Sequence, residues 1–299
     1  MTTQFNRTAL YISLAIAIAM VVGVFGGAYW VYNSTAKAPV AMSDFPSEKA
    51  DSAECRALLD ALPDDFQGHP RAEIAEPVPE GAAAWASNST ESITLRCGVD
   101  LPFQYTEYSQ TEDIEGTEWL QVNDMTPNSN LHTWYTTDRE PVVAVTFFDD
   151  SRPEGLKDAL GTLEQDKHDP HPAPLSQLVA GPDEMCRGLE AELPDELAEG
   201  YERRDIDEEN TYVWGAPGRE EIVMRCGVAP PENYEAGAQL QQINDVPWFE
   251  DTTLAGGTTA GSWFALGREN DLAVHSPQDV SGDVLVTMSN LLAEHTEEQ

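Results

Sequence analysis

Apolar residues divide the chain into one long hydrophobic segment and a remainder in which apolar and polar positions alternate. Residues 9–32 are predominantly apolar, and no charged residue occurs between Arg7 and Lys37. A helix of these 24 residues reaches roughly 36 Å, more than the roughly 30 Å hydrocarbon core of a bilayer. Tyr29 and Trp30 suit the membrane interface at its end. The pattern predicts a transmembrane helix over residues 9–32.

The charges beside this segment predict its orientation. Arg7 and the amino terminus are the nearby cations on the short side, so the positive-inside tendency places residues 1–8 in the cytoplasm and the remainder outside. A cleaved signal peptide is the alternative, with a small-residue site at residues 34–36, but its apolar core is usually about 7–15 residues long. We expect an uncleaved single-pass anchor in the cell membrane, followed by a tether over residues 33–50.

Helical periodicity recurs at the start of two later regions, and each of these segments carries a cysteine. The first apolar face comprises Cys55, Leu58, Leu59 and Leu62, and the second comprises Cys186, Leu189 and Leu193. Asp51 and Glu54 have the spacing of a capping box before the first helix. A proline follows each segment and helps to end the helix.

Alternating, β-rich segments follow each predicted helix. Residues 92–99 and 221–228 are the clearest, and each contains the second cysteine of its region. Further strands are expected at residues 119–122, 132–136, 142–148, 248–249, 263–266 and 271–275.

Each region closes with a further predicted helix. Ser151 and Glu154 precede a helix that carries Leu156, Leu160 and Leu163. The second closing helix begins at Asp283 and carries Leu285, Met288, Leu291 and Leu292. The order helix, strands, helix predicts the α+β class for both regions.

The two regions are copies of one unit. From Trp85 onward, equivalent residues lie 129 positions apart. The pairs are Trp85/Trp214, Arg96/Arg225, Cys97/Cys226, Pro102/Pro231, Tyr105/Tyr234, Ile114/Ile243, Trp119/Trp248, Trp134/Trp263, Arg139/Arg268 and Glu140/Glu269. A fixed offset over so many rare residue types indicates a duplicated domain. We predict tandem α+β domains at residues 51–166 and 181–299, joined by a stiff, Pro-rich linker at residues 167–180.

The charge is strongly acidic, with 16 Lys and Arg against 53 Asp and Glu and a formal net charge of −37. Such a chain repels nucleic acid and anionic lipid surfaces, so no nucleic-acid partner is expected. A surface for cations or for a basic partner is one interpretation of this charge. A solvated acidic face is the simpler one.

The four cysteines all lie after the apolar segment, in two repeat-equivalent pairs. Such pairs are typical of structural disulfides in an oxidising compartment. Three connectivities are possible for four cysteines. Because each unit must have folded alone before it was copied, we predict Cys55–Cys97 and Cys186–Cys226.

Repeated arginines are the best candidates for ligand binding. Arg96, Arg139 and their counterparts Arg225 and Arg268 could hold a carboxylate or phosphate in each unit. The alternative, which we favour, is that they pair with acidic residues and stabilise the fold. The repeated tryptophans are likewise expected to be core residues and not a ligand platform.

Catalytic and metal-binding patterns are absent from the sequence. His168 and His171 flank linker prolines and could be read as a metal pair, but such histidines are usually linker residues. The chain contains no nucleophile elbow, phosphate-binding loop, HExxH or dinucleotide-binding fingerprint. We therefore expect no catalytic residue, no metal and no cofactor.

The frame formed by Cys55, Trp85, residues 96–99, Trp119 and Arg139, together with its second copy, resembles one of the numbered families of domains of unknown function. Members of that family are secreted or membrane-anchored envelope proteins of high-GC Gram-positive bacteria. The resemblance covers most of residues 53–299, although members typically carry one such unit. It implies an envelope location and disulfides, and it implies no activity.

Together these patterns predict a membrane-anchored, extracytoplasmic protein that acts through binding and is not an enzyme. The first hypothesis is an interaction module that docks on another envelope protein. The second is a receptor for a small anionic ligand that uses the repeated arginines. An enzyme of envelope metabolism is the third.

Overall fold

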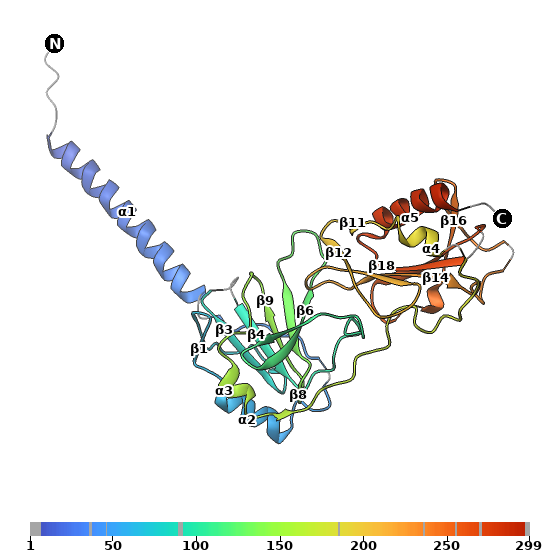
Figure 1. Cartoon of the computed structure of the whole chain (residues 1–299). Coiled ribbons are helices and arrows are strands. Elements are labelled where there is room, and N and C mark those ends of the chain that lie inside the picture. Colours follow the sequence, from blue (N-terminus) through green and yellow to red (C-terminus); the bar gives the residue numbers. More distant parts are fainter. Residues whose placement is uncertain are drawn as a thin grey trace, which may run out of the picture.

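The computed structural model describes residues 7–35, 38–45, 47–88, 92–184, 186–235, 237–254, 256–268 and 271–296. Helix α1 (Arg7–Thr35) projects away from two β-sheet bodies, here called the first unit and the second unit (Figure 1). Residues 8–31 are exposed along their whole length. The segment Thr8–Val31 has a mean hydropathy of 2.4 and is long and apolar enough to cross a membrane, properties that a signal sequence shares.

The first unit is a six-stranded antiparallel sheet with strand order β3-β4-β9-β7-β6-β5 and two helices on one face. Its elements are α2 (Ala53–Ala61), β1 (Asp65–Phe66), β2 (His69–Pro70), β3 (Ala82–Ala86), β4 (Ser92–Cys97), β5 (Thr111–Ile114), β6 (Thr117–Asn123), β7 (His132–Thr136), β8 (Arg139–Glu140), β9 (Val143–Phe147), α3 (Lys157–Leu160) and β10 (Glu164–Gln165). Strands β8 and β10 form a separate antiparallel pair, as do β1 and β2.

The second unit repeats this sheet and extends it to eight strands, in the order β11-β12-β13-β14-β18-β17-β16-β15. Its elements are α4 (Cys186–Glu190), β11 (Glu196–Ala198), β12 (Tyr201–Arg204), β13 (Thr211–Gly215), β14 (Ile222–Val228), β15 (Gln241–Ile243), β16 (Val246–Glu250), the 3-10 helix η1 (Thr252–Leu254), β17 (Ala260–Ala265), β18 (Asp271–Pro277) and α5 (Ser281–His295). Strands β13 to β18 match β3 to β9 in order, so the predicted duplication and α+β class are confirmed.

Side-chain alternation along the strands separates an inner face from an outer face in each sheet. On β4, Ile93, Leu95 and Cys97 are buried, and the residues between them are half-buried. The inner face packs against α2 and α3 in a single hydrophobic core. In both units a core tryptophan anchors the chain after the first helix: the indole N–H of Trp85 donates to Pro63 O, and that of Trp214 donates to Pro194 O, each at 2.9 Å.

Both predicted disulfides are present. Cys55 is joined to Cys97 with a Cα–Cα distance of 5.6 Å, and Cys186 is joined to Cys226 at 5.7 Å. Each bond ties the opening helix of its unit to the central strand β4 or β14. No cysteine is free, and two such bonds indicate an oxidising compartment.

Two expectations about the helices of the first unit are wrong. Helix α2 is capped by Ser52, whose side chain accepts from Cys55 N at 3.1 Å, and not by Asp51. The closing helix α3 spans only Lys157–Leu160 and has no side-chain cap, because Gly155 (φ 95°) interrupts the chain after the predicted Ser151 cap. The leucines assigned to this helix are nevertheless buried in the core. Its counterpart α5 runs for 15 residues and begins at Ser281, two residues before the predicted Asp283.

The segment between the units packs against both of them, although its prolines predicted a spacer. The backbone N–H of His168 donates to Thr137 O at 2.9 Å, and that of His171 donates to Tyr105 O at 2.8 Å. Further along, Ala173 and Leu175 are buried. The units also touch directly, through a hydrogen bond from Asn123 N to Gly218 O at 2.7 Å. Figure 1 shows them side by side, with α1 leaving from the first unit.

Candidate functional site

A cavity of about 790 Å³ lies on the outer face of the first unit's sheet. Its floor is formed by side chains of β4, β7 and β9, among them Arg96, Thr133 and Tyr135. Its walls come from three further segments: the tether at Ser43 and Phe45, the loop at residues 99–103, and the linker at residues 168–171. Chain regions far apart in the sequence therefore meet at this one surface.

Strand alternation explains why Arg96 faces this cavity. Leu95 and Cys97 point to the inner core, so the residue between them points outward. The Arg96 Nη2 donates to Ser43 O at 2.6 Å, which holds the tether against the sheet. Partial burial lowers the pKa of the Arg96 guanidinium, and the nearby Asp44 carboxylate opposes that shift.

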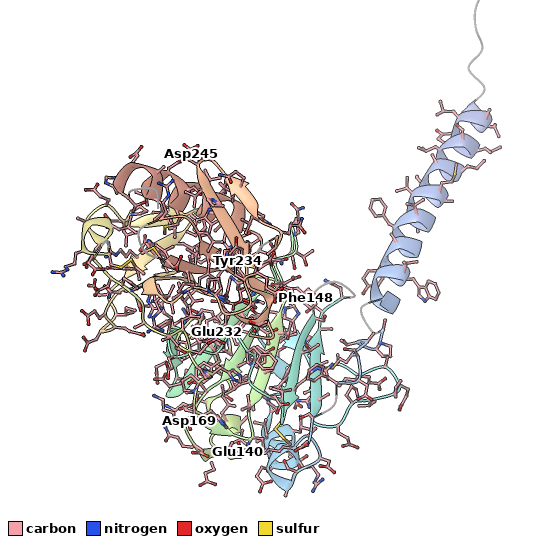
Figure 2. All side chains as sticks on the ribbon, turned by 90° about the vertical axis from the view of Figure 1, so that its right-hand side faces the viewer. Glu140, Phe148, Asp169, Glu232, Tyr234 and Asp245 are labelled. Carbon is pink, nitrogen blue, oxygen red and sulfur yellow. A yellow bond between two sulfur atoms is a disulfide. The ribbon has the colours of Figure 1, made fainter. Side chains whose placement is uncertain are left out.

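The walls of the cavity are aromatic and acidic. Phe45 and Phe103 are 57% and 55% exposed, which is unusual for phenylalanine. The Phe103 ring lies against the His171 ring with centroids 5.1 Å apart. Asp169 borders the same opening, and Figure 2 places it beside Glu140 on the first unit, away from the second unit's Asp245.

The equivalent face of the second unit is covered. Val223, Phe264 and Ala273 stand where the first unit has Thr94, Tyr135 and Ala144, and they are fully buried. Linker residues Ala173 and Leu175, together with Tyr108 of the first unit, complete this cluster.

Arg225, the counterpart of Arg96, holds the covering segment. Its Nη1 donates to Leu175 O at 2.8 Å and to Ser176 O at 3.1 Å. Arg96 and Arg225 thus have the same role, since each binds backbone carbonyls of the segment that precedes the sheet of its unit. The linker connects the two faces: residues 168–171 line the open cavity, and residues 173–178 cover its counterpart.

A smaller hollow of about 490 Å³ remains at the edge of the covered face. Pro231 and Glu232 line it, at positions equivalent to Pro102 and Phe103 of the open cavity. Figure 2 shows Glu232 and Tyr234 on the second unit. The Tyr234 ring packs edge-on against Phe249 of the covered cluster, with centroids 5.3 Å apart.

Arg139 and Arg268 do not join these sites. Arg139 forms an ion pair with Asp138 at 2.7 Å and donates to Gly116 O at 2.7 Å. Arg268 is only 4% exposed and donates to carbonyls of Thr296 and Asp245 at 3.4 and 3.3 Å. Both therefore brace loops at the sheet edge, so the four arginines divide into two sheet-face residues and two buried braces.

The linker histidines line the open cavity, and His168 Nε2 also lies 3.7 Å from Glu140 Oε2. His168 Nε2 lies 2.8 Å from Arg139 O, and His171 packs on Phe103. Within the described part of the chain, no group of three His, Cys, Asp or Glu side chains is placed to hold a metal ion.

A hydrogen-bonded set of three side chains in the second unit was not predicted from the sequence. Ser262 Oγ lies 3.0 Å from His275 Nδ1, and His275 Nε2 lies 3.2 Å from Glu220 Oε1. These residue types suit nucleophilic catalysis, but Ser262 and His275 are 2% and 3% exposed, so a substrate cannot reach the serine. In the first unit the same two positions are Thr133 and Thr146, which share a hydrogen bond at 2.9 Å. Because the first unit has threonines at these positions, comparison of the two repeats could not reveal this set of side chains.

A buried glutamate lies where the units meet. Burial raises the pKa of Glu221 to about 7, while Arg204, whose Nη1 lies 3.8 Å away, opposes the shift. The same Arg204 Nη1 donates to Tyr108 O of the first unit at 2.5 Å. The Tyr108 hydroxyl in turn donates a hydrogen bond to the Glu208 carboxylate, so charged groups of the second unit surround this one residue of the first.

The repeated sheet, disulfide and arginine together define one unit present twice. A family model described as "Protein of unknown function (DUF3515)" matches residues 14–166 and again residues 159–299. The chain belongs to the DUF3515 family. Within this family context, the resemblance drawn from the cysteine and tryptophan frame is confirmed, as is its tandem occurrence. No curated protein and no solved structure matches the chain.

Proposed function

We propose that this DUF3515 protein is a membrane-anchored, extracytoplasmic interaction module without catalytic activity, which docks on another envelope protein through the outer sheet face of its first unit. Helix α1 supports the anchor, because its length suits a bilayer and exceeds the usual core of a signal peptide. The two disulfides support an extracytoplasmic location for both units.

The difference between two equivalent faces carries the proposal. The second unit's outer face is buried beneath residues 173–178, whereas the same face of the first unit is an open cavity of about 790 Å³. A duplicated surface whose copy binds a chain segment is suited to binding one itself. Exposed Phe45 and Phe103 at the rim favour a protein partner, since exposed aromatic clusters are typical of interaction sites.

A receptor for a small anionic ligand is the second candidate, and Arg96 in the cavity favours it. Asp100 and Asp169 line the same cavity, however, and they oppose an anion. Arg139 and Arg268 lie elsewhere, and among the described residues that line the cavity Arg96 is the one lysine or arginine. The buried position of Ser262, His275 and Glu220 supports the non-catalytic reading, because the chain's best arrangement for nucleophilic catalysis lies out of reach.

Photo-crosslinking in living cells tests this function. A photoreactive phenylalanine analogue replaces Tyr135 on the cavity floor, and a matched control carries it at Phe148, which is 48% exposed and outside the cavity. We expect a crosslinked adduct with another envelope protein from position 135 and none with that protein from position 148. Equal patterns from both positions, or no adduct from position 135, would overturn the proposal.

A further inference from the structure

We infer that the open cavity of the first unit takes a short, proline-containing turn segment of a partner protein, with a leucine-sized apolar side chain and flanking basic residues. This inference rests on the proposed function and names the partner's chemistry.

The second unit supplies the template for this mode of binding. The segment Ala173–Leu178 lies across the equivalent face, and Leu175 at its centre is 1% exposed. Arg225 holds the backbone through the carbonyls of Leu175 and Ser176. The segment folds as tight turns, since Ser176 N donates to Ala173 O at 3.1 Å and Leu178 N donates to Leu175 O at 3.0 Å. The template is therefore one buried apolar side chain on a turn whose carbonyls are held by an arginine.

The first unit has the equivalent arginine, but the segment that this arginine holds covers less of the outer sheet face. Arg96 occupies the position of Arg225 and donates to Ser43 O of the tether at 2.6 Å. The tether's aromatic side chain, Phe45, stays 57% exposed and does not fill the cavity as Leu175 fills its counterpart. The remaining volume, about 790 Å³, lies in the range of occupied ligand sites, roughly 300–1,000 Å³.

The lining of the cavity selects the chemistry of the segment. Asp100 and Asp169 stand at its walls, within a chain of net charge −37, so basic flanks are attracted and acidic flanks repelled. The Phe103 ring, which is 55% exposed and rests against the His171 ring, offers an aromatic surface against which proline rings can pack. Prolines also restrict the backbone of a free segment, which reduces the entropy lost on binding.

The linker sequence itself provides the probe. A synthetic peptide of residues 170–180, with two lysines added at each end, is titrated against the full chain in lipid nanodiscs. The titration reaches about 2 mM, because short tethers act at effective concentrations in the millimolar range and the linker binds its own unit in that way. We expect saturable binding and a weaker response from the same peptide flanked by glutamates.

Two variants assign the binding to the cavity. Thr133→Trp fills the floor and is expected to abolish binding, whereas Thr111→Trp, at an exposed position outside the cavity, leaves it unchanged. Arg96→Gln is expected to weaken binding about 5–10-fold, because it removes a cavity-lining guanidinium and releases the tether wall that this guanidinium holds through Ser43 O, with exposed Arg152→Gln as its control. Circular dichroism confirms that each variant is folded.

Each other outcome overturns the inference in a recognisable way. Absence of saturable binding, or equal binding by Thr133→Trp, removes the peptide from this cavity. Equal affinity for the lysine-flanked and glutamate-flanked peptides contradicts the charge argument. A response to inorganic phosphate alone that is lost in Arg96→Gln would favour the anion receptor instead. An adduct at position 135 in cells without peptide binding overturns this inference alone, whereas a missing adduct overturns the proposed function.

Discussion

The four repeated arginines bind backbone carbonyls more than they form ion pairs. Arg96 and Arg225 bind carbonyls of the preceding segment, and Arg268 binds carbonyls at the sheet edge. Arg139 alone among the four combines carbonyl contacts with a short ion pair. A guanidinium suits this work because its five donors spread over a planar fork that can serve several acceptors at once.

Removing Arg139 should destabilise the first unit. The Arg139–Asp138 pair is 11% and 7% exposed, so Arg139→Ala leaves a poorly hydrated carboxylate, and we expect a loss of about 3–5 kcal/mol in unfolding free energy. Arg152→Ala is the control, because its pair with Glu112 is 42% and 50% exposed and should contribute about 0–1 kcal/mol. Urea unfolding measures both variants. Equal losses would contradict the assignment of Arg139 as a buried brace.

Glu221 should make stability depend on pH. Its folded pKa, about 7, lies above the ordinary value of 4.5, so the folded state holds this proton more tightly than the unfolded state. The contribution of protonated Glu221 to the free energy of unfolding is therefore fully present below about pH 4.5, and it is lost as the pH rises through 7. Glu221→Gln should gain stability relative to the unmodified protein between pH 5 and pH 8, by on the order of 3 kcal/mol.

Thermal unfolding across this pH range measures the gain, with exposed Glu232→Gln as the control. A difference between Glu221→Gln and the unmodified protein that stays constant with pH would show that burial does not perturb this carboxyl group.

At the scale of elements, each unit is held by three connections: a disulfide, a tryptophan anchored to a proline carbonyl, and a covering segment gripped by an arginine. The repeated Cys-Gly-Val sequence has a specific cause. Gly98 and Gly227 adopt φ of 83° and 69°, and a Cβ on Gly98 would lie 2.5 Å from the Lys49 carbonyl carbon. Only glycine lets the end of strand β4 or β14 pass this close to the preceding segment.

The first disulfide should contribute substantially to the first unit. Cys55 and Cys97 are 42 residues apart, and closing a loop of that length stabilises by about 4 kcal/mol on the chain-entropy account. We expect a Cys55→Ser/Cys97→Ser double variant to lower the first unit's unfolding free energy by about that amount. Calorimetry of the full chain should show the second unit's transition in place. A loss shared equally by both units would mean that they unfold as one.

The covering segment should be as important as a core strand. Leu175→Ala removes a side chain that is 1% exposed, so we expect a loss of about 2–5 kcal/mol. Val179→Ala, at a side chain that is 66% exposed in the same segment, should change stability by less than about 0.5 kcal/mol. Urea unfolding compares the two variants. A small effect of Leu175→Ala would mean that the second unit's outer face tolerates being uncovered, which would weaken the template for peptide binding.

At the scale of the whole molecule, the proposed arrangement is an anchor, a unit with an open face and a unit with a covered face. Ser43 and Phe45 of the tether that follows α1 line the open cavity, so the binding surface is expected to lie close to the membrane. The acidic charge of the remainder keeps the units away from anionic lipid, which leaves the cavity accessible from the side.

Fractionation of cells tests the anchor. We expect the mature protein to remain in membranes after alkaline carbonate extraction, with its amino terminus intact. A tag at the carboxyl terminus should be digested by protease added from outside. Recovery of the chain from the culture medium with an amino terminus near Pro39 would contradict the anchor and establish cleavage.

Sequence alone determined the parts of this protein that depend on local order and on duplication. The long apolar run and the strands predicted at residues 92–99 and 132–136 followed from periodicity, and both disulfide pairings followed from the duplication of the unit. These features are visible in sequence because hydrophobic burial sets a period for each element, and because a copied unit repeats its own partners.

Only the tertiary structure decided what the surface of each unit does. The linker prolines indicated a spacer, but the packing of Leu175 made the segment part of the second unit's core. Arg96 and Arg225 are equivalent in sequence, yet one borders a cavity and the other holds its cover. The Ser262–His275–Glu220 chain is likewise set by contacts between distant residues. Local sequence cannot fix such contacts, because the free energy of covering a face depends on which distant segment reaches it.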